Sequence, residues 1–298
     1  MILKGRIPFV YIIKELKSPL FFVTFISIVC GILPHYFGSF LSDIPISIAT
    51  TLGVAISILL SYKINQSYDR WWEARKIWGE IVNDSRTLVL QLKMYVTDNS
   101  SEVKSLSYLQ IAWCYCLGKW LRKEDSKDEL RKWISAINFE QLKTQKNYPL
   151  GILSIQTRSI RQLYLNNQLD RFSQIRIEET LERLTTSMGK CERIKNTVFP
   201  PMYKYGLHAT IYLFVVFLAL SVSFRLQHIV LEMAILVIVS MVFFFLEKAA
   251  FRMQDPFENV PTDTPMTSIS RKIESNILEL LGEIHVDKPV KSGKFYVL

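Results

Sequence analysis

Hydrophobic residues in this chain gather in four runs that are long enough to cross a membrane. A bilayer core of about 30 Å requires roughly 20 predominantly apolar residues in a helix. The four runs are Leu20–Phe37, Ile44–Tyr62, Gly206–Phe224 and Ile229–Leu246. The second and third contain no acidic residue, lysine or arginine, and very short linkers join the runs in two pairs. This arrangement predicts four membrane-spanning helices rather than the buried helices of a soluble protein.

Between the two pairs of runs, apolar positions recur every three or four residues, which is the period of a helix. The pattern predicts helices over 63–97, 103–123, 127–136, 138–146, 151–168 and 171–197. After the fourth run, a proline-punctuated loop leads to a further amphipathic helix. We expect Thr264 to cap that helix, Pro265 to occupy its first position and Gly282 to end it. No strand pattern is present, so the predicted fold class is an all-α membrane protein.

These elements predict five segments along the chain. An N-terminal segment with two spans is followed by a helical cytoplasmic domain, two more spans, a C-terminal loop and helix, and a tail. Their boundaries are 1–62, 63–205, 206–248, 249–284 and 285–298.

The composition supports a large polar domain beside the spans, because 21% of the residues are charged although 49% are hydrophobic. The net charge is +9, and lysine and arginine are absent from the linker 38–43 between the first two runs. By the positive-inside rule, we expect both termini and the central domain in the cytoplasm. Basic and acidic residues are interspersed, which indicates topology and contact with a lipid bilayer rather than binding of nucleic acid.

The second apolar run continues into a charged helix without a helix-breaking signal. Helical pattern persists from Ser47 to about Asn83, a rod of roughly 55 Å. Val54, Ile58 and Tyr62 share one face of this rod at a spacing of four. Two interpretations stay open at this point: that face packs tightly against another helix, or it lines a passage through the membrane.

The sequence contains no catalytic constellation, cofactor motif or metal-ligand spacing. The cysteines at positions 30, 114, 116 and 191 are interpreted as buried thiols. Glu73, Glu80 and Asp84 lie among basic residues at helical spacing, which predicts ordinary ion pairs along one helix. Those basic residues are Arg70, Arg75, Lys76 and Arg86. We therefore expect no enzyme.

The stretch "DRWWEARKIWGEIVNDSR" at 69–86, directly after an apolar span, resembles the bacterial bestrophin family. Within it, Arg70, Trp71 and Trp72 form the part that is also shared with animal bestrophins. Three further segments fall in the expected order: "IPIS" at 44–47, "FPP" at 199–201 and "DPFENVP" at 255–261. The resemblance covers almost the whole chain except the last dozen residues.

The resemblance implies an ion channel of the bacterial inner membrane, a homopentamer with one axial pore. In the family, the second span lines a narrow hydrophobic neck, and the matching positions here are Val54, Ile58 and Tyr62. Helical periodicity selects the same three, which favours the passage over mere packing. A cytoplasmic constriction in the family matches Phe172, near the start of the helix before the third span.

The resemblance also bears on metal binding. Animal bestrophins bind calcium through a dense acidic run after the fourth span, but the matching segment here offers only Asp255, Glu258 and Asp263. Calcium needs about six or more converging oxygens. We therefore expect no calcium gate and no metal site.

The sign of the permeant monovalent ion is open in the family, because animal members pass chloride and some bacterial members resemble sodium channels. Asp43 near the outer mouth and Asp69 below Tyr62 would form acidic rings, which favour cations. Lys63 and Arg70 lie close to Asp69 and oppose this effect. The sequence leans towards a sodium-permeable channel; the alternatives are an anion (chloride) channel and a membrane-anchored scaffold.

Overall fold

The computed structural model describes residues 8–37, 44–96, 100–197, 200–223, 225 and 229–283. These residues form ten helices and no strand, which confirms the all-α prediction. The chain divides into two compact units, each described by itself. The membrane unit contains the described residues up to Arg70 and those from 200 to 254, and the polar unit contains 71–197 and 255–283.

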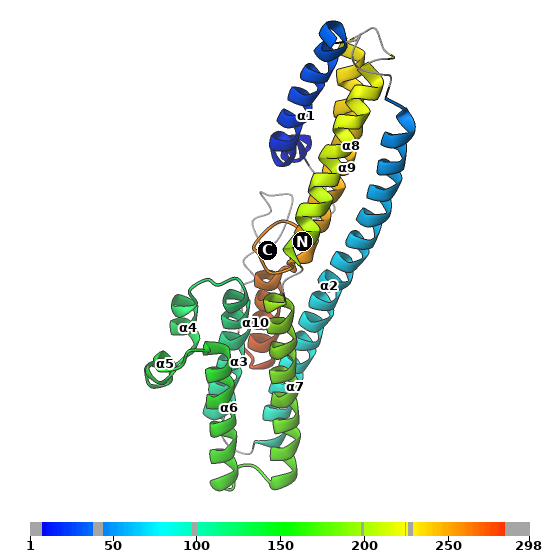
Figure 1. Ribbon diagram of the computed structural model, residues 1–298. Coiled ribbons are helices and arrows are strands. Elements are labelled where there is room, and N and C mark those ends of the chain that lie inside the picture. Colours follow the sequence, from blue (N-terminus) through cyan, green and yellow to red (C-terminus); the bar gives the residue numbers. More distant parts are fainter. Residues whose placement is uncertain are drawn as a thin grey trace. The chain divides into compact units, whose positions relative to one another are not determined.

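The membrane unit consists of α1, the first part of α2, α8 and α9, which are labelled in Figure 1. Their bounds are Phe9–Phe37, Ile46–Tyr95, Pro201–Ser223 and Ile229–Gln254. α1 packs against α8 and α9, and α8 packs against α9. All four are long and apolar enough to cross a membrane, so the prediction of four spans is confirmed.

α1 begins well before the apolar run that predicted it, because its first turns are held by α9. The Arg252 guanidinium donates to the Glu15 carboxylate at 2.6 Å and to the Tyr11 hydroxyl at 2.7 Å. Lys248 lies 3.7 Å from the same carboxylate. Charged residues lower the hydropathy of this segment, so only the tertiary contacts show that the helix extends to Phe9.

The polar unit contains the rest of α2 together with six shorter helices (Figure 1). They are α3 (Ser100–Leu121), α4 (Lys127–Trp133), α5 (Ala136–Lys143), α6 (Tyr148–Leu165), α7 (Arg171–Asn196) and α10 (Met266–Leu280). α3 packs against α6, α7 and α10. The short helix α4 packs against α3, and α5 packs against α6 and α4. The order of these helices agrees with the sequence prediction, and their ends differ from it by a few residues.

Local capping explains several helix ends. The Asn147 side chain accepts a hydrogen bond from the backbone N–H of Leu150 at 3.1 Å, which starts α6. Gly282 adopts φ +77°, so the predicted stop after α10 is confirmed. The predicted cap Thr264 is wrong: Pro265 is the N-cap and makes no side-chain cap bond. The Thr264 N–H donates to the Pro256 carbonyl instead, because the preceding loop folds back on itself.

The core of the polar unit is apolar with one buried amide network. Gln110 Nε2 donates to Ser85 Oγ at 2.8 Å, and Gln156 Nε2 donates to Gln110 Oε1 at 3.1 Å. Burial raises the pKa of the Cys114 and Cys116 thiols to about 12, so neither is a reactive thiolate. All four cysteines are free and buried, as predicted.

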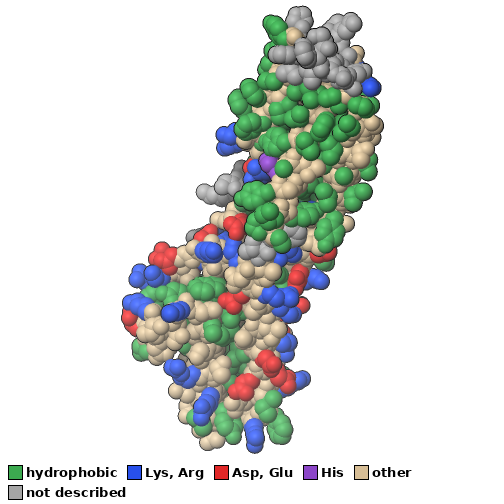
Figure 2. Space-filling model, viewed as in Figure 1, with side chains coloured by type: hydrophobic (Ala, Val, Ile, Leu, Met, Phe, Trp, Pro, Cys, Tyr) green, Lys and Arg blue, Asp and Glu red, His purple; other side chains and the backbone are tan. Residues whose placement is uncertain are grey.

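The surfaces of the two units differ in composition. Figure 2 shows apolar side chains over most of the visible surface of the membrane unit, whereas lysine, arginine and acidic side chains are interspersed over the polar unit. Apolar surface of this kind is stable only in contact with lipid or with other protein.

Candidate functional site

The face of α2 selected by helical spacing is accessible among the residues that the structure describes. Val54 is 57%, Ile58 65% and Tyr62 56% exposed, although all three are largely apolar and lie in a candidate span. They line an open groove of about 700 Å³ whose wall includes Phe243 of α9. The structure therefore brings the three predicted neck residues to one accessible surface.

The opposite face of α2 is fixed by packing inside the membrane unit. Ala49, Ile56 and Leu60 are buried in its apolar core. A Cβ added at Gly53 would lie 3.3 Å from the Phe214 ring of α8, so the two helices approach closely at this glycine. Because that face is occupied, Val54 and its partners point away from the chain's own core.

Three hydroxyl groups of this part of α2 are bonded to their own helix. The side chains of Thr50, Thr51 and Ser57 donate to the carbonyl oxygens four residues earlier, at 2.8–3.0 Å. The Tyr62 hydroxyl accepts a hydrogen bond from Gln66 Nε2 at 2.6 Å. Ser61 and Asn65 also line the groove on this face, so polar side chains lie beside the three large ones.

A buried lysine lies in the membrane unit beside the C-terminal end of α9. Lys63 is fully buried; its Nζ donates to Gln254 Oε1 at 2.5 Å and lies 4.8 Å from the centre of the Phe251 ring. Arg70 Nε donates to the backbone carbonyl of Gln254 at 3.0 Å. Asp69 is exposed. Lys63 is thus buried against α9, whereas Asp69 is exposed, and the expected effect of Lys63 on the charge of Asp69 stays a prediction.

The two adjacent tryptophans begin the polar unit. Trp71 Nε1 donates to the Thr262 carbonyl at 2.8 Å, which ties α2 to the loop before α10. The Trp72 ring stacks on it with centroids 6.2 Å apart and stays partly exposed. Within the polar unit this motif connects the helix to the loop, a role that the residues alone did not indicate.

Phe172 is the second residue of α7 and is 82% exposed. The Asp170 carboxylate accepts hydrogen bonds from the N–H groups of Phe172 and Ser173 at 2.9 and 3.1 Å. Its bonds to Ser173 and then Phe172 lower the pKa of Asp170, as expected for an N-cap. This cap fixes the ring's place in its unit, and the predicted constriction stays a prediction.

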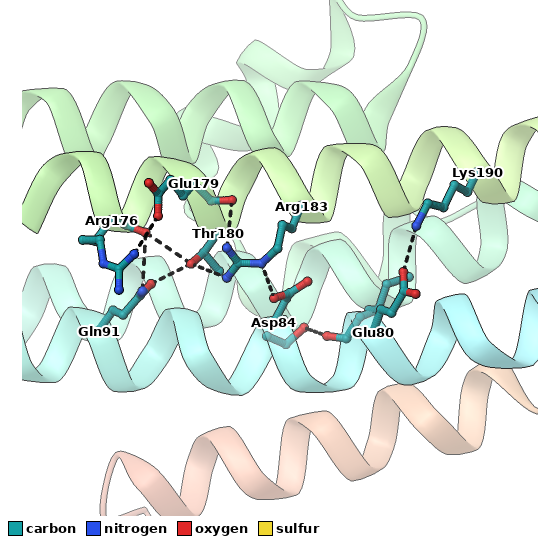
Figure 3. Close-up of polar contacts among 10 residues, drawn as sticks. Glu80, Asp84, Gln91, Arg176, Glu179, Thr180, Arg183 and Lys190 are labelled. Atoms are coloured by element: carbon teal, nitrogen blue, oxygen red, sulfur yellow. Dashed lines mark hydrogen bonds and ion pairs between the residues drawn. The ribbon is translucent and has the colours of Figure 1, made fainter.

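A ladder of polar contacts joins α2 to α7 (Figure 3). Lys190 pairs with Glu80 at 3.1 Å and Arg183 with Asp84 at 2.8 Å. Further along, Thr180 donates to Gln91 at 2.8 Å. The prediction that these acids pair along their own helix is therefore wrong: their partners lie on a segment about a hundred residues away, which spacing along one helix cannot reveal.

Three more acidic residues were considered for ion or metal binding: Asp43, Glu258 and Asp263. Asp43 lies outside the described residues. In the loop before α10, Glu258 pairs with Lys195, and the Asp263 carboxylate accepts a hydrogen bond from the Asn259 N–H. Within the described ranges, no group of three or more His, Cys, Asp or Glu side chains is arranged to hold a metal ion.

We expect acidification from about pH 7 to about pH 5 to stabilise the protein through Asp263. Burial raises the pKa of this carboxyl to about 6, whereas an unfolded aspartate has a pKa near 4. Between these values the folded chain keeps a proton that the unfolded chain has lost. The free energy of unfolding therefore falls as the pH rises through this window.

Unfolding temperatures of the wild type and Asp263→Asn, in detergent at both pH values, test this expectation. Asparagine keeps the acceptor for the Asn259 N–H without a buried charge. The variant should be more stable near neutral pH and depend less on pH. The same pH dependence in both proteins would refute the assignment.

The chain is similar to a known protein family and to named channel proteins. The model of a family described as bacterial/fungal bestrophin protein matches residues 4–279. A relative from Escherichia coli strain K12, named voltage-dependent anion channel-forming protein YneE, is 30% identical over 247 residues, covering 83% of this chain and 80% of the relative. A protein of Mesorhizobium japonicum named in the same way, mll4386, is 29% identical over 296 residues and covers 93% of each chain.

A solved structure agrees with these relatives. The crystal structure of a bacterial bestrophin homologue from Klebsiella pneumoniae has a TM-score of 0.85 and 25% identity, and the match covers 91% of this chain and all of that one. The curated relatives are named as channels and not as enzymes, in agreement with the sequence prediction.

Proposed function

This protein belongs to the bacterial/fungal bestrophin family, and from that premise we propose that it forms an ion channel passing monovalent anions across the bacterial inner membrane. The observation that carries the proposal is the face of α2, where three large, mostly apolar side chains at a spacing of four are more than half exposed. In the described part of one chain, this face lines an open groove and is accessible to other copies.

In the proposal, symmetric copies of the chain stand around an axis and turn Val54, Ile58 and Tyr62 towards it. Each position then becomes a ring, and the three rings make a hydrophobic neck one helical turn apart. Apolar rings of this kind gate by losing their water. The number of copies, five, follows from the family resemblance, and closed symmetry is the common arrangement of homo-oligomers in solution.

The neck carries no charge, so the sign of the permeant ion is set elsewhere. The names of the curated relatives favour anions, and so does the net charge of +9. The earlier preference for sodium finds no support in those names. One observation keeps cations as the second candidate: Asp69 is exposed, whereas Lys63 is buried and Arg70 is bound to Gln254.

Reversal potentials of the purified protein in planar bilayers should decide the sign. Under a gradient of sodium chloride we expect the current to reverse close to the chloride equilibrium potential. Asp69→Asn should move the reversal further in that direction, because it removes the acidic side chain. A reversal near the sodium potential that Asp69→Asn weakens would establish the cation channel instead.

Native mass spectrometry and flux into sealed vesicles separate the channel from a membrane-anchored scaffold. The channel requires a ring of subunits, five in this proposal, and ion flux without added partners. A monomer or dimer that leaves vesicles tight would support the scaffold. The same proposal places both termini in the cytoplasm, on the strength of the distribution of lysine and arginine.

A further inference from the structure

A pocket of about 220 Å³ in the polar unit lies between α3, α4 and α10, and no step of ion conduction uses it. Four basic side chains line it: Lys119, Arg122, Lys132 and Arg271. The volume is below the roughly 300–1,000 Å³ of sites for drug-sized ligands. The pocket is therefore sized for a small molecule or for one group of a larger one.

The central feature of the pocket is the guanidinium of Arg122. Its Nη1 donates to the Thr267 hydroxyl at 2.8 Å, but its Nε and Nη2 are buried and have no hydrogen-bond partner. These two atoms form the edge of a guanidinium that binds both oxygens of a carboxylate or phosphate in parallel. Burial lowers the pKa of this group, which reflects the cost of an uncompensated charge in this place.

Other donors around the pocket also lack partners. Trp133 Nε1 on α4 and Ser270 Oγ on α10 are buried without a hydrogen bond, and Ser270 is only 1% exposed. The first turn of α10 has no side-chain cap, and its Met266 N–H donates to the Thr264 carbonyl at 2.8 Å. Among the described residues, the side chains of Trp133 and Ser270 thus have hydrogen bonds to give and no acceptor to receive them.

The acidic residues of the pocket are already engaged. Glu129 pairs with Lys132 at 3.0 Å, Glu124 accepts from the Asn259 side chain at 3.1 Å, and Glu274 accepts from the Tyr115 hydroxyl. These contacts leave Arg122, Lys119 and Arg271 without a carboxylate partner among the described residues.

Two carboxylates attract Arg122 electrostatically, Glu124 more strongly than the buried Asp263. In the part of the chain that the structure describes, however, neither a hydrogen bond nor an ion pair joins either carboxylate to the guanidinium. The parallel donors of Arg122 are therefore not satisfied from within this unit.

We propose that this pocket binds a small oxyanion, namely the phosphate or carboxylate group of a soluble ligand, at the guanidinium of Arg122. Ser270 and Trp133 are the further donors beside it. The shared chemistry is a planar or tetrahedral oxyanion with at least two acceptor oxygens. A free phosphate, a nucleotide phosphate and a metabolite carboxylate all present it.

Isothermal titration of the full-length protein in detergent tests the proposal. Inorganic phosphate, citrate and ATP are titrated separately in a chloride buffer of constant ionic strength. We expect saturable binding of at least one probe, and the tightest of the three identifies the source of the group. No saturable binding of any of them to the wild type would overturn the proposal.

Variants of Arg122 show whether the bound group sits where proposed. Arg122→Gln should weaken binding at least tenfold, and Arg122→Lys should lie in between, because it keeps the charge but loses the parallel donors. Arg161→Gln, an exposed arginine on α6, is the matched control and should bind as the wild type does. Unchanged affinity in a folded Arg122→Gln variant would overturn the proposal.

A second pair of variants remains informative if Arg122→Gln fails to fold. Arg271 lines the pocket, whereas its neighbour Lys272 does not, and both are exposed. Arg271→Gln should weaken binding several-fold and Lys272→Gln should leave it unchanged. Equal weakening by both would overturn the proposal, since it would show attraction to surface charge alone. Binding is the readout throughout, so the result is independent of ion conduction.

Discussion

An Ile58→Ala variant is expected to carry several times the single-channel current of the wild type. Ile58 is the middle and most exposed of the three proposed neck residues. Every copy of the chain contributes one side chain to the same ring, so one substitution removes apolar bulk all around the axis. A wider and less apolar ring stays wet more of the time, and a wet neck conducts.

Single-channel recording in planar bilayers measures this effect, with Leu59→Ala as the control. Leu59 follows Ile58 in α2 but points about 100° away around the helix, and it is also partly exposed. The control should leave the conductance near the wild-type value. Equal conductance in Ile58→Ala and the wild type, or a larger rise in Leu59→Ala, would place the neck on a different face of α2.

The largest loss of stability is expected for Trp78→Ala, at about 3–5 kcal/mol. Trp78 is fully buried in the core of the polar unit, and its ring lies 3.8 Å from the position of a Cβ added at Gly118 of α3. Its Nε1 makes no hydrogen bond, so the loss comes from packing and from the cavity that alanine leaves. The ring fills a space that neighbouring helices cannot close.

Unfolding of the detergent-solubilised protein, followed by size-exclusion chromatography after heating, measures this loss. Trp120→Ala is the control, because Trp120 is partly exposed and donates to Glu192 at 3.0 Å. We expect a cost of about 1 kcal/mol for it. Comparable shifts in the two variants would contradict the central place of Trp78 in this core.

The neck residues illustrate what helical periodicity can determine. Val54, Ile58 and Tyr62 share one face because 3.6 residues make a turn, and the structure leaves that face accessible. Periodicity also predicted helix over 63–97, and α2 ends at Tyr95. The contacts of Gln91 with α7, which lie near this end, are tertiary and could not be predicted from spacing along one helix.

Lys63 shows what helical periodicity cannot determine, namely the direction of a long charged side chain. In the sequence it stands between an apolar run and a charged helix, and it was expected to contribute charge beside Asp69. The structure buries it against Gln254 and Phe251, almost two hundred residues away. A lysine's long chain can turn either to solvent or inward, so its direction depends on whether a distant segment supplies a partner.

The sequence by itself determined the number of spans, the helical class and the face of α2 that stays free, because these follow from periodicity, hydropathy and a local motif. Only the tertiary structure decided which charges are paired across α2 and α7, where Lys63 points and that Arg122 keeps two donors unused. Helical order is a property of neighbouring residues. The partners of charged side chains depend on distant segments that folding brings together.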